Sequence, residues 1–192
     1  MCDTKGVIHT GRTDLNDYKR RHAVATSVRT LQEALRGAHV FIGVSAADSV
    51  TADDVRGMAE YPAIFAMANP DPEIHPEIVA GVMGTKPFVM VTGRSDYPNQ
   101  INNVLGFPYL FRGALDVRAR TINTAMKVAA SEALAALARE PVPSDVQALY
   151  PQEKLSFGNG YIIPKPFDRR LFVEISYAVA KAAVESGAAP AD

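Results

Sequence analysis

Three short apolar runs stand out along the chain, at residues 40–44, 63–67 and 88–91. Each run is nearly continuous rather than alternating, which is the pattern of a strand buried on both faces of a parallel sheet. The segments between the runs carry the start signals of helices. Because strands that alternate with helices form right-handed crossovers, the pattern predicts an α/β fold with a parallel sheet.

Polar residues mark the expected helix starts. Thr30 is followed three residues later by Glu33, and acidic residues follow Thr51 in the same way, as in a capping box. Pro76 stands where a helix would have its first residue, a position that proline favours. Ahead of these helices, residues 6–11 are bracketed by glycines and predict a small hairpin or an excursion at the sheet edge.

The pattern changes beyond residue 103. Residues 121–139 are alanine-rich and contain good helix formers throughout, which predicts one long helix. Prolines punctuate residues 141–166, so this stretch is expected to be mostly loop. A last alanine-rich helix is predicted over residues 170–186, ended by Gly187. The tail, residues 188–192, is expected to fray.

Charge and cysteine content exclude several classes of protein. The 20 basic and 21 acidic side chains give a net charge of −1, which leaves no electrostatic footprint for nucleic acid or an anionic membrane. Cys2 is the single cysteine, so neither an intramolecular disulfide nor a multi-thiolate zinc site is expected. No apolar stretch reaches the ~18 residues of a membrane span, and the N-terminus lacks a secretory signal. We therefore expect a cytoplasmic protein.

A glycine-rich phosphate loop is missing from the sequence. A dinucleotide-binding sheet normally begins with a strand and a G-x-G-x-x-G turn, and neither this motif nor a Walker loop occurs. Asp3 stands about where the acidic residue after the second strand of such a fold would lie. It could hold a ribose 2′-hydroxyl, or it could be a solvated surface acid. The expected fold is a partial Rossmann-type parallel sheet that lacks its first βα unit.

Small and polar residues follow the first two apolar runs directly. Asn69 comes after the second run and is locked by the prolines that follow it. Ligands of open parallel sheets bind at the carboxyl ends of strands, and an amide there suits a ribose hydroxyl or a carboxylate. The alternative is a simple turn. Ser45 and Ala46 end the first run, where a flat cofactor or ordinary loop packing would be accommodated equally well.

A second amide-rich turn, NQINN, spans residues 99–103 and precedes an apolar segment. Buried amides must be satisfied by backbone, water or ligand, and a helix cap uses one asparagine or two. The surplus favours a ligand. Elsewhere, Asp71, Glu73 and Glu77 form an acidic group that is expected to cap the following helix. The four histidines are scattered and predict no metal site.

Several stretches resemble the malic enzymes of the bacterial type. The most specific is TGRSDYPNQINNVLGFPYLFRGALD at residues 92–116. The others are KGVIHTGR at residues 5–12, FAMANPDPEI at residues 65–74 and YIIPKPFD at residues 161–168. Together these stretches extend the resemblance over essentially the whole chain.

The resemblance implies oxidation of malate with NAD or NADP and its decarboxylation to pyruvate, assisted by Mg²⁺ or Mn²⁺. It implies that Asn69 lies at the nicotinamide ribose and the substrate, and that Asn103 contacts the substrate carboxylate. It places Asn102, Ser45 and Ala46 at the cofactor. Residues 1–120 would then be a partial NAD(P)-binding domain, and residues 121–192 a C-terminal helical extension. Homo-oligomers are expected for the full enzyme.

The family's general-base lysine, catalytic tyrosine and acidic metal ligands have no counterpart in the sequence. No catalytic or metal-binding residue is therefore assigned, and the chain alone is expected to be inactive. Asp3 as ribose ligand would favour NAD, whereas Lys5, Arg12 and Lys19 nearby could reverse that preference. Two alternatives stay open, a non-catalytic interaction module that kept the fold and a cofactor domain of the amino-acid-dehydrogenase type.

Overall fold

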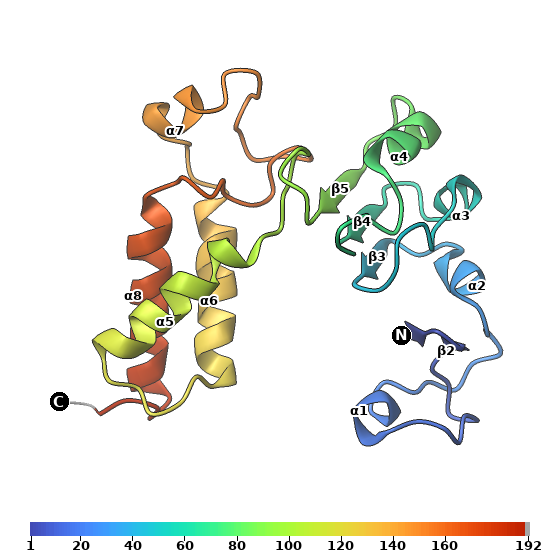
Figure 1. Ribbon diagram of the computed structural model, residues 1–192, viewed down its shortest axis with the longest axis horizontal. Coiled ribbons are helices and arrows are strands. Elements are labelled where there is room, and N and C mark those ends of the chain that lie inside the picture. Colours follow the sequence, from blue (N-terminus) through green and yellow to red (C-terminus); the bar gives the residue numbers. More distant parts are fainter. Residues whose placement is uncertain (191–192) are drawn as a thin grey trace. The chain divides into compact units, whose positions relative to one another are not determined.

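The computed structural model describes residues 1–190 (Figure 1). Contacts divide the chain into two compact units, Met1–Val89 and Met90–Asp192. The division concerns contacts, so the domain boundary expected near residue 120 stays a prediction. No helix among the described residues is long and apolar enough to cross a membrane.

The first unit opens with a two-stranded antiparallel hairpin of β1 (Cys2–Asp3) and β2 (Gly6–Val7). The hairpin therefore begins before the predicted segment 6–11 and overlaps it at residues 6–7. Gly6 has a φ of +102°, and a Cβ there would lie 2.2 Å from the Arg29 carbonyl oxygen. The glycine thus lies within the hairpin, where it allows the backbone at Arg29 to approach closely. A short helix, α1 (Asp17–Arg20), follows and is capped by the Asn16 side chain.

Three further helices of this unit begin as the sequence predicts. α2 (Leu31–Leu35) starts with a capping box between Thr30 and Glu33. α3 (Ala52–Arg56) has the same device at Thr51, and α4 (Pro76–Met83) has its proline at the first helical position. These predictions are confirmed because the signals are local: the capping groups lie within three residues of each other.

The predicted strands form one sheet in the order β3 (Val40–Gly43), β4 (Ala63–Ala66) and β5 (Val89–Thr92). β3 and β4 are parallel, with Val40 opposite Ala63 and Gly43 opposite Ala66. β5 begins at Val89, whose N–H donates to the Pro62 carbonyl at 3.0 Å. The α/β class and the parallel sheet are thus confirmed.

One face of β3 is exposed, contrary to the prediction of a strand buried on both faces. Phe41 and Gly43 are buried, whereas Val40 and Ile42 are 52% and 66% exposed, as is Val44 just beyond the strand at 76%. A parallel strand is buried on both faces only where elements cover both. No element among residues 1–190 buries this face of β3, which also lies at an edge of the sheet.

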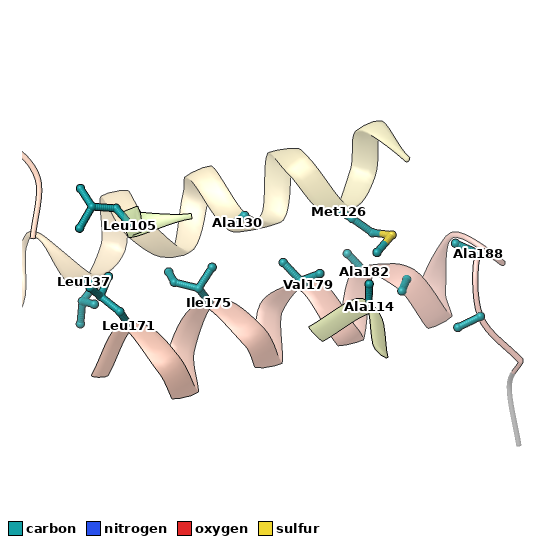
Figure 2. Packing of buried hydrophobic residues seen from close by; sticks show 12 residues of the cluster. Leu105, Ala114, Met126, Ala130, Leu137, Leu171, Ile175, Val179, Ala182 and Ala188 are labelled. Carbon is teal, nitrogen blue, oxygen red and sulfur yellow. The ribbon is translucent and has the colours of Figure 1, made fainter. Parts of the chain in front are cut away.

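The second unit is helical. After η1 (Asn103–Leu105) it contains α5 (Phe107–Asp116), α6 (Thr124–Leu137), α7 (Ser144–Ala148) and α8 (Arg170–Glu185). α5 and α6 both pack on α8 (Figure 1). Figure 2 shows Ile175 and Val179 of α8 facing α6, from which Ala130 and Met126 point into the same core.

The two long helices are found where they are predicted, with α6 a few residues shorter at its start because Asn123 caps it. α8 ends next to Gly187, which has a φ of +70°. The expected fraying of the tail is wrong for Ala188 and Ala189, which are buried. Both N–H groups donate to the Ala183 carbonyl, and the Ala188 carbonyl accepts from Arg120. Residues 191–192 of the expected tail lie outside the described residues.

Candidate cofactor and substrate site

The turns after β3 and β4 lie at the same edge of the sheet, because the two strands are parallel and Gly43 pairs with Ala66. Ser45 and Ala46 follow β3 and are exposed. Asn69 follows β4 and is exposed, directly after the buried Ala68; its peptide bond to Pro70 is cis. The structure therefore brings these three candidates to the carboxyl ends of neighbouring parallel strands, where ligands of open α/β sheets bind.

A buried carboxylate connects these two turns. Glu73 is fully buried, and its Oε1 accepts the N–H of Ser45 at 2.8 Å while its Oε2 accepts the N–H of Ala68 at 3.0 Å. The prediction that this acid caps the following helix is wrong. α4 has no side-chain cap, because the Glu73 carboxylate is used by the strand ends. Glu77 does lie in the first turn of α4.

Asp3 lies in β1, and two cations hold its carboxylate. Arg12 donates from Nη1 to Oδ1 at 2.8 Å and from Nη2 to Oδ2 at 3.0 Å. Lys19 Nζ donates to Oδ2 at 2.6 Å, and the backbone N–H of Lys5 donates to Oδ1 at 3.0 Å. The Asp3 side chain is only 13% exposed. This acid is thus held in place rather than freely solvated.

A second acid completes the cluster around Arg12. Asp14 Oδ2 accepts from Lys5 Nζ at 2.8 Å and from Arg12 Nη2 at 2.9 Å. The hydrogen bonds from Arg12, and then those from Lys19 and Lys5, hold the pKa values of Asp3 and Asp14 far below their usual range. Both acids are therefore ionised at neutral pH. Three cations and two carboxylates leave the cluster one net positive charge.

Two of the four side-chain amides in the turn at residues 99–103 are used internally. Asn99 is buried; its Nδ2 donates to the carbonyls of Met90 at 3.1 Å and Asn159 at 2.7 Å. Its Oδ1 accepts the N–H of Ile162 at 2.8 Å. Gln100 Nε2 donates to the Gly93 carbonyl at 3.3 Å. The surplus that favoured a ligand is thus reduced, because backbone groups satisfy these two side chains.

The two remaining amides of the turn are exposed. Asn102 Oδ1 accepts the N–H of Val104 at 3.0 Å and so caps η1, and the residue is exposed. Asn103 is the first residue of η1 and is also exposed. Both side chains are accessible to a ligand, so their predicted roles at cofactor and substrate stay predictions.

The candidates fall into groups that each lie within one unit. Ser45, Ala46 and Asn69 share a sheet edge of the first unit with Glu73. The helix cap predicted for Glu73 is not the role that the structure shows. The sequence signal for Glu73 is weak, namely an acid placed between the apolar residues Pro72 and Ile74. Asn102 and Asn103 belong to the second unit. Among the described residues, no group of three or more histidine, cysteine, aspartate or glutamate side chains could hold a metal ion.

A parallel sheet with helices between its strands is the architecture of an α/β protein of the Rossmann type. The family model described as malic enzyme, NAD binding domain, matches residues 1–156. The chain therefore belongs to the malic enzyme family. Its Rossmann-type neighbours include the crystal structure of Entamoeba histolytica malic enzyme, with a TM-score of 0.80 and 32% identity. That match covers 97% of this chain and 37% of the other.

Relatives with similar sequences have names of the same kind. The NADP-dependent malic enzyme of Rhizobium meliloti (strain 1021) is 63% identical over 98% of this chain and 25% of that protein. The NADP-dependent malic enzyme of Halomonas elongata is 57% identical over 98% of this chain and 44% of that protein. An NAD-dependent malic enzyme of Rhizobium meliloti is 51% identical over 97% of this chain. The chain thus spans between 24% and 44% of the length of these relatives.

Proposed function

We propose that this chain is the part of a malic enzyme that binds NAD(P) and orients malate during its oxidative decarboxylation to pyruvate. The observation that carries the proposal is the shared carboxyl edge of β3 and β4, with Ser45, Ala46 and Asn69 exposed on it. The high identity to NADP-dependent malic enzymes over nearly the whole chain supports the choice of reaction.

The candidate residues have separate roles in this proposal. NAD(P), when bound, supplies a nicotinamide that accepts a hydride. Ser45 and Ala46 offer small side chains and backbone against which the nicotinamide ribose can lie. Asn69 both donates and accepts hydrogen bonds, so it can hold a ribose hydroxyl and a substrate oxygen together. Asn103 donates to the malate carboxylate, and Asn102 lies on the cofactor side.

The described residues do not fit a divalent metal, since they offer no cluster of metal-binding side chains. We therefore assign no step of the reaction to a metal within this chain. Nor do we assign a general base, a group that typically contributes a factor of about 10²–10⁴ in rate. The chain by itself is proposed to bind cofactor without turning malate over.

An assay of the 192-residue chain tests both halves of this proposal. Isothermal titration calorimetry is expected to give saturable binding of NADPH. Incubation with malate, NADP or NAD, and Mn²⁺ is expected to give no absorbance increase at the wavelength of the reduced nicotinamide. Turnover above a no-enzyme control would refute the claim of inactivity, and failure to bind NADPH or NADH would refute the claim of a cofactor-binding part.

We further propose that the cofactor is NADP rather than NAD. The Asp3 carboxylate already accepts four hydrogen bonds, which fills the roughly four lone-pair positions of a carboxylate. It has no capacity left for a ribose diol, whereas the net positive cluster attracts a 2′-phosphate.

The two adenosine halves of the cofactors test this preference. We expect 2′,5′-ADP to bind on the order of tenfold more tightly than 5′-AMP, a difference of about 1.4 kcal/mol. Lys19→Ala should remove most of that difference, because it deletes one of the two cations that donate to Asp3 Oδ2 and with it the net positive charge of the cluster. Lys154→Ala, an exposed lysine of the second unit, serves as the control. Equal or tighter binding of 5′-AMP by the unaltered chain would contradict the preference for NADP.

A further inference from the structure

Glu73 is a fully buried acidic residue at the candidate site and has no part in the function proposed for the chain. Its side chain is fully buried, and its two oxygens accept two backbone N–H groups that are far apart in the sequence. Burying a carboxylate is costly unless hydrogen bonds compensate it. An acid in this position therefore requires an explanation beyond the packing of a turn.

The two N–H groups occupy equivalent places on neighbouring strands. Gly43 and Ala66 are the last paired residues of β3 and β4, and Ser45 and Ala68 each follow two residues later. The last backbone hydrogen bond between the two strands runs from the Met67 N–H to the Gly43 carbonyl at 3.1 Å. Beyond that bond, the Glu73 carboxylate joins the two segments, because one of its oxygens accepts a hydrogen bond from the segment after β3 and the other accepts one from the segment after β4.

Backbone bonds fix Glu73 against the turn after β3. Its own carbonyl accepts the N–H of Val50 at 3.0 Å, and the preceding Pro72 carbonyl accepts the N–H of Asp48 at 3.2 Å. The carboxylate also depends on Gly43, since a Cβ there would lie 2.4 Å from its carboxyl carbon. Gly43 and Glu73 thus form a matched pair at the ends of the strands.

We propose that Glu73 is a positioning residue that sets the spacing of the two turns for the nicotinamide half of the cofactor. The inference rests on the proposed function. The N–H groups that Glu73 holds belong to Ser45, one of the candidate residues, and to Ala68, which directly precedes Asn69. Without the carboxylate, the two turns lose the hydrogen bonds that the Ser45 and Ala68 N–H groups donate to one shared side chain, and the candidate residues separate at the sheet edge.

Glu73→Gln tests the proposal because it preserves size but places an NH₂ group against one of the two backbone donors. We expect the affinity of the 192-residue chain for NADPH to fall about tenfold or more. The affinity for 2′,5′-ADP, which lacks the nicotinamide half, is expected to stay unchanged. The amide proton resonances of Ser45 and Ala68 should also move upfield, because a charge-assisted hydrogen bond is weakened.

A purely structural role would not give this selective loss. If the affinities for NADPH and 2′,5′-ADP fell together, or if neither changed, the positioning role would be overturned. If the unaltered chain bound neither ligand, the proposed function itself would fail. Glu60→Gln, an exposed acid of the same unit, is the matched control and should change neither affinity.

A second variant and a measurement on the unaltered chain cover the case in which Glu73→Gln does not fold. Gly43→Ala displaces the carboxylate without removing its charge and should give the same selective loss of NADPH binding. In the unaltered chain, NADPH but not 2′,5′-ADP should shift the amide resonances of Ser45 and Ala68. The absence of these shifts in a chain that binds NADPH would overturn the proposal.

Discussion

At the scale of single residues, the types of side chain at the site were predictable and their partners were not. The amides of residues 99–103 were noticed because they are numerous, yet Asn99 bonds to residues 60 and 63 positions away along the chain. Glu73 likewise bonds to Ser45, 28 positions away. No local pattern encodes such distances, so a ligand was expected where backbone groups already satisfy Asn99.

Asn99→Ala is expected to lower the stability of the second unit. It removes three hydrogen bonds and leaves the Met90 and Asn159 carbonyls and the Ile162 N–H without this partner. A buried group that loses its partner costs about 1–3 kcal/mol, so the melting temperature should fall by several degrees. Asn103→Ala, an exposed amide of the same turn, should change stability by less than about 0.5 kcal/mol. Equal melting temperatures for the two variants in a thermal scan would contradict the structural role of Asn99.

The Asp3 cluster predicts loss of stability in acid. The folded pKa of Asp3 lies below its unfolded value of about 3.9, so its contribution is complete above that value and is lost as the pH falls below it. The melting temperature of the unaltered chain should therefore decline as the pH is lowered from about 5 to 3. Asp3→Asn should have a lower melting temperature at pH 7 and a shallower decline. Parallel profiles for the two proteins would show that Asp3 contributes nothing.

At the scale of helices and strands, prediction succeeded where the signal is local. The caps at Thr30 and Thr51 and the proline start of α4 involve neighbouring residues, and all three helices begin as expected. Burial is not local. The exposed face of β3 and the buried Ala188 depend on what lies beside them in space, so the apolar run and the alanine-rich tail were both misinterpreted.

The contact between α5 and α8 predicts a sharp response to one added methyl group. Gly113 of α5 would place a Cβ 2.4 Å from the Ser176 carbonyl oxygen and 2.8 Å from the Val179 Cβ. Gly113→Ala must therefore push the helices apart, at a cost of about 1–3 kcal/mol. Chemical denaturation measures this cost.

Gly81→Ala in α4 is the matched control, because a Cβ there has no neighbour within 4 Å. Alanine in an open helical position is expected to stabilise by up to about 1 kcal/mol. The two glycine variants should thus change the midpoint of unfolding in opposite directions. A neutral Gly113→Ala would contradict the close packing of α5 on α8.

At the scale of the whole molecule, the family was predictable because the resemblance at residues 92–116 is long and specific, and the family model now confirms it. The α/β sheet was predictable from the alternation of apolar runs and helix signals. The location of Ser45, Ala46 and Asn69 at one sheet edge was only partly predictable. Parallel pairing of β3 and β4 places the strand ends together, but it does not show which side chain connects the turns that follow them. The Glu73 carboxylate supplies that connection.

The central claim is that the carboxyl edge of β3 and β4 binds the nicotinamide half of the cofactor. Titration of the ¹⁵N-labelled chain with NADPH, followed by amide NMR, tests this claim most directly. We predict saturable shifts that concentrate at residues 45–46 and 68–69 and at the cluster around Asp3. Saturable binding with shifts confined to other parts of the chain, or no shifts at all, would contradict it.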